Sequence, residues 1–272
     1  MIRDITIGQF YPTDSVIHRL DPRVKLFATM IYIIALFVFK GVLGLGIITL
    51  FLAGIIRISK VPFKFMTKGL KAIVLLLVIT SVFNLLATPG DVVFWKWGSL
   101  QITDTGIINS VLMTIRLVYL ILGTSLMTLT TTPNQLTDGL ETALKPLNKL
   151  NVPVHSIAMM MSIALRFIPI LIEETDKIMK AQMARGADFE KGNLLEKAKN
   201  MVPLLVPLFV SAFRRAEDLA MAMEARCYNG GEGRTKMKPL KYDKRDYVAY
   251  GTVIGFLVLV IVAAVLLPFP QG

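Results

Sequence analysis

Long apolar runs, separated by short polar or basic segments, occupy the first half of the chain and its C-terminal end. Five runs are expected to cross a bilayer as helices: 24–39, 42–56, 70–86, 107–129 and 247–267. A span needs about 20 apolar residues, and lysine or arginine beside the shorter runs can extend them to the interface. The first helix is expected to begin at Pro22, with Asp21 as its cap. The pattern therefore predicts an all-α, polytopic membrane protein with about five transmembrane helices.

Between residues 131 and 246 the pattern changes, and charged residues are interspersed with apolar ones at helical spacing. Two amphipathic stripes recur there, and each ends in an arginine between two small residues. The stripes are Leu171, Thr175, Ile178, Met179 and Gln182 before Arg185, and Ala212, Ala216, Leu219 and Met223 before Arg226. The two arginines are 41 residues apart and hold the same register in their stripes. The spacing predicts two long helices that each place an arginine at the C-terminal end.

Glycine is the main signal for where these helices stop. Gly186 follows the first arginine directly and is expected to end the first helix, whereas Cys227 holds the same place in the second copy. The second helix is therefore expected to stop at Asn229 or Gly230. A single arginine at a helix end is usually a solvated cap, but two in the same register favour a role in docking a partner.

Two further apolar runs, 157–172 and 201–213, precede the amphipathic stripes, and both contain proline. They could form an additional transmembrane hairpin without changing the topology of the rest of the chain. The first run also holds Arg166, so helices that lie along the cytoplasmic face, or half-buried in it, are favoured.

Composition narrows the class further. The chain has 272 residues, is 54% hydrophobic and has a mean hydropathy of +0.61, which is far too apolar for a soluble domain. Its net charge of +11 comes largely from bases near apolar spans, which is typical of an orientation signal and not of a nucleic-acid surface. One cysteine, Cys227, and two separated histidines, His18 and His155, exclude an internal disulfide and a Cys/His zinc site. No cofactor or metal is expected.

The distribution of bases predicts the topology. The segment 57–71 contains five bases and no acid and is placed in the cytoplasm, as is the segment 173–246. The segment 87–106 has few bases and carries Trp95 and Trp97, so it is placed on the outer face. The N-terminus lacks an apolar signal core and is placed in the cytoplasm. We expect N-terminal transmembrane helices (1–130), a coupling domain of long cytoplasmic helices (131–246) and a C-terminal transmembrane helix (247–272).

A membrane enzyme and a stand-alone secondary transporter are the competing classes. An enzyme would need clustered carboxylates, a His/Glu metal set or an activated nucleophile, and no such set occurs in the apolar runs. A secondary transporter should show broken helices and ionisable pairs at mid-membrane, and only Arg116 fits that description. Arg116 could equally pair with a polar group inside the bundle to support assembly.

Five short motifs follow one another along the chain. They are His-Arg-Leu-Asp-Pro-Arg at 18–23, Thr-Thr-Thr-Pro at 130–133, Ala-Leu-Arg-Phe-Ile-Pro at 164–169, Ala-Gln-Met-Ala-Arg-Gly at 181–186 and Glu-Ala-Arg-Cys-Tyr at 224–228. In this order they resemble the EcfT/CbiQ family, the transmembrane scaffold of bacterial energy-coupling factor importers. The resemblance implies a non-catalytic subunit in the cell membrane. That subunit would bridge two cytoplasmic ABC-type ATPases and a small substrate-binding membrane protein, the S component.

In this family two Ala-Arg-Gly-like motifs end the coupling helices and dock in the ATPases. Carried over to this chain, the resemblance implies these ATPase-docking residues: Ala184, Arg185, Gly186, Ala225, Arg226 and Cys227. Cys227 departs from the usual glycine, but it is small enough to be compatible with docking.

Methionines are candidates for contact with an S component, because this side chain adapts to several partners. The candidates are Met159, Met160, Met161, Met201, Met221 and Met223. Ordinary core packing is the alternative for any one of them. No residue identifies the substrate. A scaffold shared by several S components is favoured, and a dedicated cobalt, nickel or biotin importer is the alternative.

Overall fold

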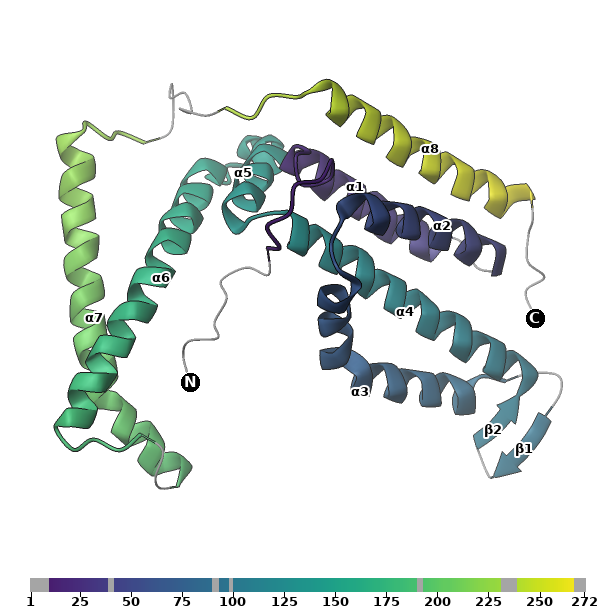
Figure 1. Cartoon of the computed structure of the whole chain (residues 1–272), viewed down its shortest axis with the longest axis horizontal. Helices are drawn as coiled ribbons and strands as arrows, with labels where there is room; N and C mark the ends of the chain where they lie inside the picture. Colours follow the sequence, from purple (N-terminus) through teal and green to yellow (C-terminus); the bar gives the residue numbers. More distant parts are fainter. Residues whose placement is uncertain are drawn as a thin grey trace. The chain divides into compact units, whose positions relative to one another are not determined.

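The computed structural model of the chain describes residues 10–38, 42–89, 93–97, 100–189, 193–230 and 239–266. In chain order, the elements are α1 (Pro22–Val38), α2 (Val42–Ser59), α3 (Phe63–Ala87), β1 (Val93–Trp97), β2 (Leu100–Thr103), α4 (Asp104–Thr130), α5 (Pro133–Leu144), the 3-10 helix η1 (Lys145–Leu150), α6 (Val154–Ala184), α7 (Leu194–Ala225) and α8 (Lys244–Leu266) (Figure 1). Among the described residues the regular structure is helical apart from one β-hairpin. The all-α prediction is confirmed.

The chain forms two compact units, with boundaries after Gly139 and after Pro239. The bundle unit contains α1 to α4 and α8. The α6–α7 unit contains η1, α6 and α7, and the two units share α5. The first boundary therefore falls within α5, and the division into transmembrane and cytoplasmic parts stays a prediction.

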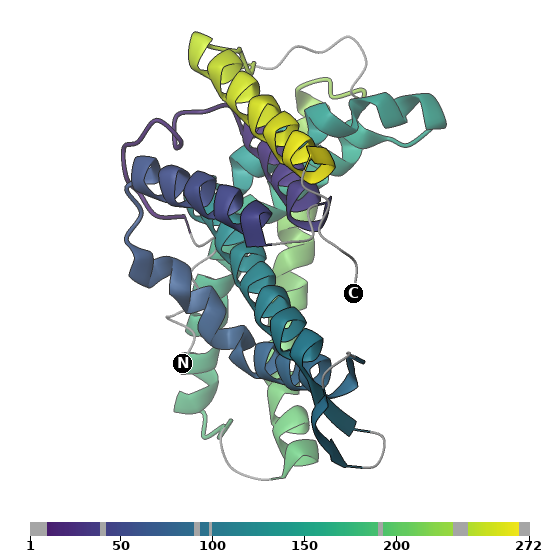
Figure 2. The same cartoon turned by 90° about the vertical axis from the view of Figure 1, so that its right-hand side faces the viewer.

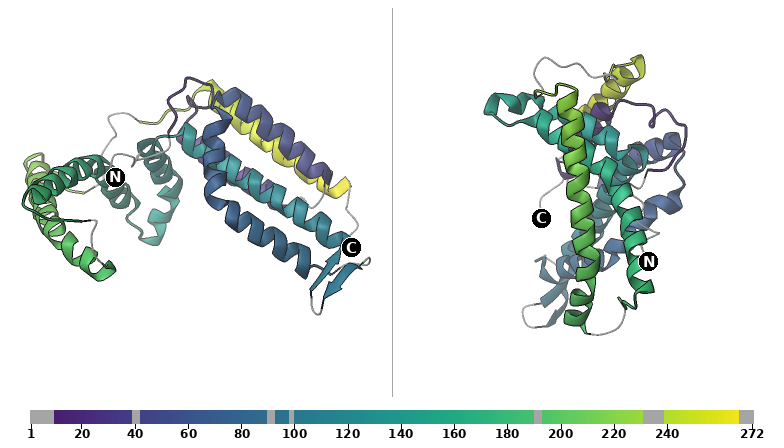
Figure 3. Two further views of the ribbon diagram at one scale, coloured as in Figure 1. Left: turned by 60° about the horizontal axis from the view of Figure 1, so that its bottom comes forward. Right: turned by 90° about the vertical axis from the view of Figure 1, so that its left-hand side faces the viewer.

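The core of the bundle unit is an apolar cluster to which α1, α2, α3, α4 and α8 all contribute. Its most buried members include Leu36, Ile48, Met66, Leu129 and Val260. Figure 2 shows α8 beside α1 and α2, and Figure 3 shows α3 running along α4. Burial of this kind contributes about 1.5–3 kcal/mol for each large aliphatic side chain when water is the alternative surrounding.

A glycine sets the closest approach of α1 to α4. A Cβ added at Gly123 would lie 2.2 Å from Cε1 of Tyr32, a distance that no packed side chain can keep. The hydroxyl of Tyr32 donates a hydrogen bond to the carbonyl oxygen of Tyr119 at 2.9 Å. The Tyr32 ring therefore fills the place that any larger residue at position 123 would occupy.

The segment before α1 packs on the end of α4, which brings the motifs at 18–23 and 130–133 together. The buried ammonium group of Lys25 donates to the carbonyl oxygens of His18 (3.1 Å) and Thr130 (2.8 Å). Burial lowers the pKa of the His18 imidazole, so the ring is neutral near pH 7. Its Nε2–H donates to the carbonyl oxygen of Tyr11 (3.1 Å), and Nδ1 accepts from the hydroxyl of Ser15 (2.7 Å).

Asp21 caps α1 as predicted, because its Oδ1 accepts the backbone N–H of Arg23 at 2.9 Å. The same carboxylate holds the guanidinium of Arg23, which also lies over the ring of Tyr242 at 3.9 Å. The buried carboxylate of Asp246 accepts the backbone N–H groups of Asp21 (2.9 Å) and Asp243 (2.8 Å). The starts of α1 and α8 are therefore joined, through Asp21 and Asp246, which are 225 residues apart in the sequence.

Two connecting segments differ from the sequence-based prediction. The basic segment 57–71 was expected to lie between two separate helical spans, but most of it is helical, because α2 continues to Ser59 and α3 begins at Phe63. The segment after α3 contains the antiparallel strand pair β1–β2, which the pattern of residues 87–106 did not predict. A short turn around Lys60, whose φ is 55°, reverses the chain between α2 and α3.

Several helices are suited to a bilayer. Within the described ranges, α4, α6 and α8 are long and apolar enough to cross one, and α2 with the start of α3 would add a broken span bent by 119°. α1, with 17 residues, falls just short of a full span. The count of five transmembrane helices therefore stays a prediction.

Candidate functional site

α6 and α7 are the longest helices of the chain, with 31 and 32 residues, and they cross each other (Figures 1 and 3). The apolar runs at 157–172 and 201–213 are not separate helices but lie within α6 and α7. Both helices continue through internal prolines, at Pro169 in α6 and at Pro203 and Pro207 in α7. Each proline removes one intrahelical hydrogen bond and permits a kink. The kink-prone part of each helix is therefore its apolar half.

α6 ends in a Schellman cap immediately beside Arg185. Arg185 is the C-cap residue, and Gly186 adopts the left-handed conformation with φ of 88°. The N–H of Gly186 donates to the carbonyl oxygen of Met183, and the N–H of Ala187 donates to that of Gln182, both at 3.0 Å. These two bonds satisfy carbonyl groups that a helix end otherwise leaves unpaired. The predicted helix stop at Gly186 is confirmed.

α7 ends in the same cap, with Arg226 in the place of Arg185. The N–H of Cys227 donates to the carbonyl oxygen of Glu224 (2.8 Å), and the N–H of Tyr228 donates to that of Met223 (3.0 Å). Cys227 has φ of 55°, so a cysteine holds the left-handed position that glycine holds in α6. The expected stop at Asn229 or Gly230 is wrong, because α7 ends at Ala225, before both of them.

Both arginines stand at exposed helix ends, and neither has a polar partner among the residues that the structure describes. Arg185, Arg226 and the flanking Ala184 and Ala225 are exposed. In the part of the chain that the structure describes, neither guanidinium donates a hydrogen bond or forms an ion pair. Each therefore keeps all five N–H donors available in a planar fork that fits carboxylate oxygens.

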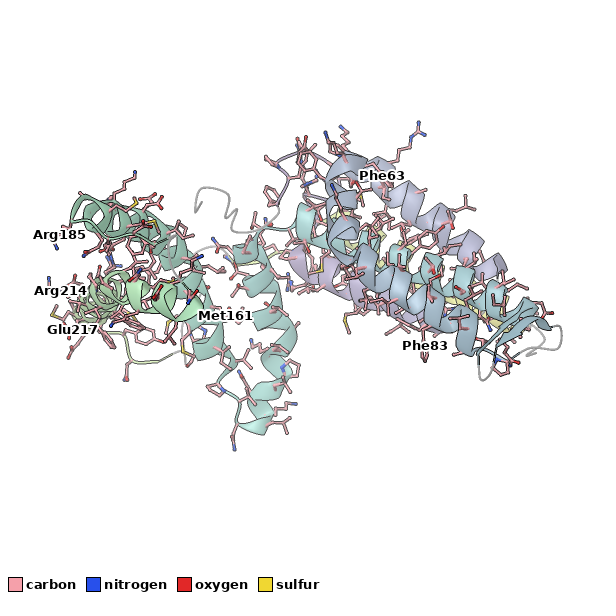
Figure 4. All side chains as sticks on the ribbon, turned by 90° about the horizontal axis from the view of Figure 1, so that it is seen from below. Phe63, Phe83, Met161, Arg185, Arg214 and Glu217 are labelled. Carbon is pink, nitrogen blue, oxygen red and sulfur yellow. The ribbon has the colours of Figure 1, made fainter. Side chains whose placement is uncertain are left out.

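The α6–α7 unit exposes both charged and apolar side chains. Figure 4 shows Arg185, Arg214 and Glu217 along one side, whereas Met161 lies on the other. Of the six methionines expected to contact an S component, Met160, Met161, Met201 and Met221 are exposed, and Met159 and Met223 are partly buried.

An exposed apolar row on α7 lies within the apolar run at 201–213. It consists of Val202, Leu205, Val206, Phe209, Val210 and Phe213. Their spacing of three and four residues is typical of one helix face, which the sequence analysis did not identify. The helix continues through Pro203 and Pro207, which lie within this run.

The crossing of α6 and α7 contains a polar contact that the sequence analysis also missed. The Oε2 atom of Glu174, on α6, accepts hydrogen bonds from Nη2 (2.8 Å) and Nε (3.2 Å) of Arg215 on α7. The other carboxylate oxygen accepts the hydroxyl of Ser211, one turn earlier on α7. All three residues are partly buried.

The remaining candidates, Arg116 and His155, lie on different helices. Among the described residues, no three His, Cys, Asp or Glu side chains are grouped as metal ligands. Arg116 lies half-buried in the middle of α4, and its role stays a prediction. His155 bonds to Glu141 through Nδ1 at 3.0 Å, within a partly exposed pair that holds the start of α6 against α5.

Comparison with known proteins agrees with the motifs. Residues 13–237 match the CbiQ family model, which is described as a cobalt transport protein. The chain is 58% identical to the energy-coupling factor transporter transmembrane protein EcfT of Clostridium kluyveri over 92% of this chain and 93% of that one. It is 49% identical to the EcfT protein of Bacillus subtilis over 90% and 93% of the two chains. The chain therefore belongs to the EcfT/CbiQ family of energy-coupling factor transporter transmembrane proteins.

Proposed function

We propose that the chain is the non-catalytic coupling subunit of an energy-coupling factor importer, with Arg185 and Arg226 as the contacts to two cytoplasmic ATPases. One observation carries the proposal: both arginines stand at helix caps with the same hydrogen-bond pattern, and both are exposed and without a polar partner among the described residues. A guanidinium that is left unpaired at a fixed helix end is suited to an acidic groove on another protein. The paired caps match the two ATPases of such a complex.

The small residues beside each arginine support close docking. Ala184 and Ala225 precede the arginines, and Gly186 and Cys227 follow them, so both sequence neighbours of each arginine are small. Truncating one partner of a hydrogen-bonded charge pair in an interface costs about 2–5 kcal/mol. ATP hydrolysis belongs to the partner subunits, and the chain itself transmits their movement.

The exposed apolar side chains of the α6–α7 unit are assigned to the membrane and to the S component. They include the apolar row on α7 and Met160, Met161 and Met201, whose exposure to water would be unfavourable. Methionine side chains adapt to different partner shapes, which suits a scaffold shared by several S components. The N-terminus and the helix ends at Arg185 and Arg226 are then cytoplasmic.

The test is co-purification of the tagged chain from its native host. Replacing both arginines (Arg185→Glu and Arg226→Glu) is expected to remove both ATPases, because each reversed charge would face the acidic groove that had bound it. The matched control is Arg214→Glu, which makes the same charge change at an exposed, unpaired arginine on α7. The control is expected to retain the ATPases. Full retention by the double variant would exclude the proposal.

The same purification distinguishes a shared scaffold from a dedicated one. Several different small membrane proteins beside the ATPases would identify a shared scaffold. A single such protein would identify a dedicated importer and would name its substrate.

A further inference from the structure

The contact at the crossing of α6 and α7 joins equivalent positions of two repeats. Glu174 and Arg215 are 41 residues apart, the same separation as Arg185 and Arg226. Glu174 precedes Arg185 by 11 residues, and Arg215 precedes Arg226 by 11 residues. The two helices therefore cross at matching points, and each continues for the same length to its terminal arginine.

The two segments beyond the crossing are uninterrupted helices. Prolines lie inside α6 and α7 only on the N-terminal side of the contact, at Pro169, Pro203 and Pro207. No proline or glycine occurs between Glu174 and Arg185 or between Arg215 and Arg226. At 1.5 Å per residue, each segment is a straight arm of about 16 Å. The apolar halves can bend at their prolines while the arms keep their shape.

We propose that Glu174 and Arg215 are positioning residues that fix the angle between the two arms, and thereby the separation of Arg185 and Arg226. Arg215 donates two hydrogen bonds to one carboxylate oxygen of Glu174, and the hydroxyl of Ser211 donates to the other oxygen. These hydrogen bonds fix the orientation of the carboxylate in addition to the attraction between the two charges. This inference rests on the proposed docking of the two arginines in two ATPases.

The stability gained from this contact is modest, which agrees with a role in geometry. The side chain of Arg215 is 40% exposed and that of Glu174 is 21% exposed, so water screens their attraction. Its effect on docking is larger, because two linked sites bind tightly only when their separation matches that of the partner sites. If the angle between α6 and α7 could vary, the second arginine would less often lie at its binding site once the first had docked, so its effective concentration there would be lower.

The neighbouring residues provide matched controls. Glu173 and Arg214 each precede a member of the contact by one position, so they are also equivalent in the two repeats. Both are exposed, and neither has a hydrogen bond or ion pair within the described ranges. Removing their charges changes the composition of the helices in the same way but leaves the crossing intact.

The experiment measures the distance between the arms in the full chain, purified without ATPases. Spin labels are placed at Ala181→Cys and Ala222→Cys, exposed and equivalent positions four residues before the arginines, on a Cys227→Ser background. The unmodified crossing should give one narrow distance distribution. Glu174→Gln or Arg215→Gln should lose it, whereas Glu173→Gln and Arg214→Gln should keep it.

Exchange of the charges separates positioning from general damage to the fold. The double variant Glu174→Arg with Arg215→Glu should restore the narrow distribution, because the pair is re-formed with its members exchanged. Retention of the ATPase pair should fall about tenfold in the single variants and recover in the exchanged one. An unchanged distribution in the single variants, or no recovery on exchange, would overturn the inference. These distances need no ATPase, so they stand even if the double-glutamate test rejects docking.

Discussion

The ends of α6 and α7 carry different residues after the arginine, Gly186 in one and Cys227 in the other, but the same backbone. Both residues are left-handed, with φ of 88° and 55°, and both caps make the same pair of backbone hydrogen bonds. Glycine adopts this conformation without steric strain, whereas a residue with a Cβ loses about 1–2 kcal/mol. The cap geometry therefore comes from the helix end and its hydrogen bonds, and glycine only makes it easier to form.

The two helix caps are also expected to differ in stability. The α7 cap bears the strain of Cys227, and it has the acidic Glu224 two residues before the arginine, where α6 has Met183. A negative charge near a helix C-terminus opposes the helix dipole. We expect the end of α7 to fray more readily than the end of α6.

The largest expected effect comes from removing the glycine of the stronger cap. Gly186→Val should weaken the last turn of α6 by about 2 kcal/mol, which is roughly a 30-fold rise in local opening. A Cβ at this position meets nothing within 4 Å, so the loss is purely conformational. Hydrogen exchange of the amides of Gln182 to Ala187 measures it. Cys227→Val is the matched variant and should lose less, because Cys227 already carries a Cβ.

A reciprocal exchange of residues gives a smaller effect in opposite directions. Cys227→Gly should slow hydrogen exchange in the last turn of α7 about fivefold, and Gly186→Cys should speed it in α6 by a similar factor, for about 1 kcal/mol each. In the chain with both substitutions, the last turn of α7 should exchange more slowly than before and the last turn of α6 faster. If Cys227→Gly has no effect, the left-handed conformation of Cys227 is not a source of strain.

The smallest effect concerns the charge before the second arginine. Glu224→Gln should stabilise the end of α7 by about 0.5 kcal/mol, an approximately twofold slowing of hydrogen exchange. The gain should diminish as salt concentration rises, because the effect is electrostatic and the residue is exposed. Met183→Gln in α6 is the control and should show no salt dependence. A gain that is independent of salt would indicate a change in helix propensity instead.

The sequence predicted well those features that depend on residues within a single helix, namely its location and its ends. Hydrophobic runs located α1, α2, α4 and α8, and the paired stripes located the helix ends that carry both arginines. Asp21 and Pro22 predicted the start of α1, because a cap depends on residues within one turn. The prediction failed at Cys227, since the preference for glycine in a left-handed position is only about 1 kcal/mol, and two cap hydrogen bonds outweigh it.

The sequence by itself determined the class of the chain, the family and the register of the two arginines, because these follow from local pattern and motif order. The tertiary structure decided which residues of different helices meet. Glu174 and Arg215 were visible as opposite charges 41 residues apart, but only the packing of α6 on α7 brings them into contact. The place of Tyr32 beside Gly123 was decided in the same way. Helix pairing depends on the sum of many side-chain contacts along two surfaces, so the sequence pattern of one helix does not identify the helix that packs against it.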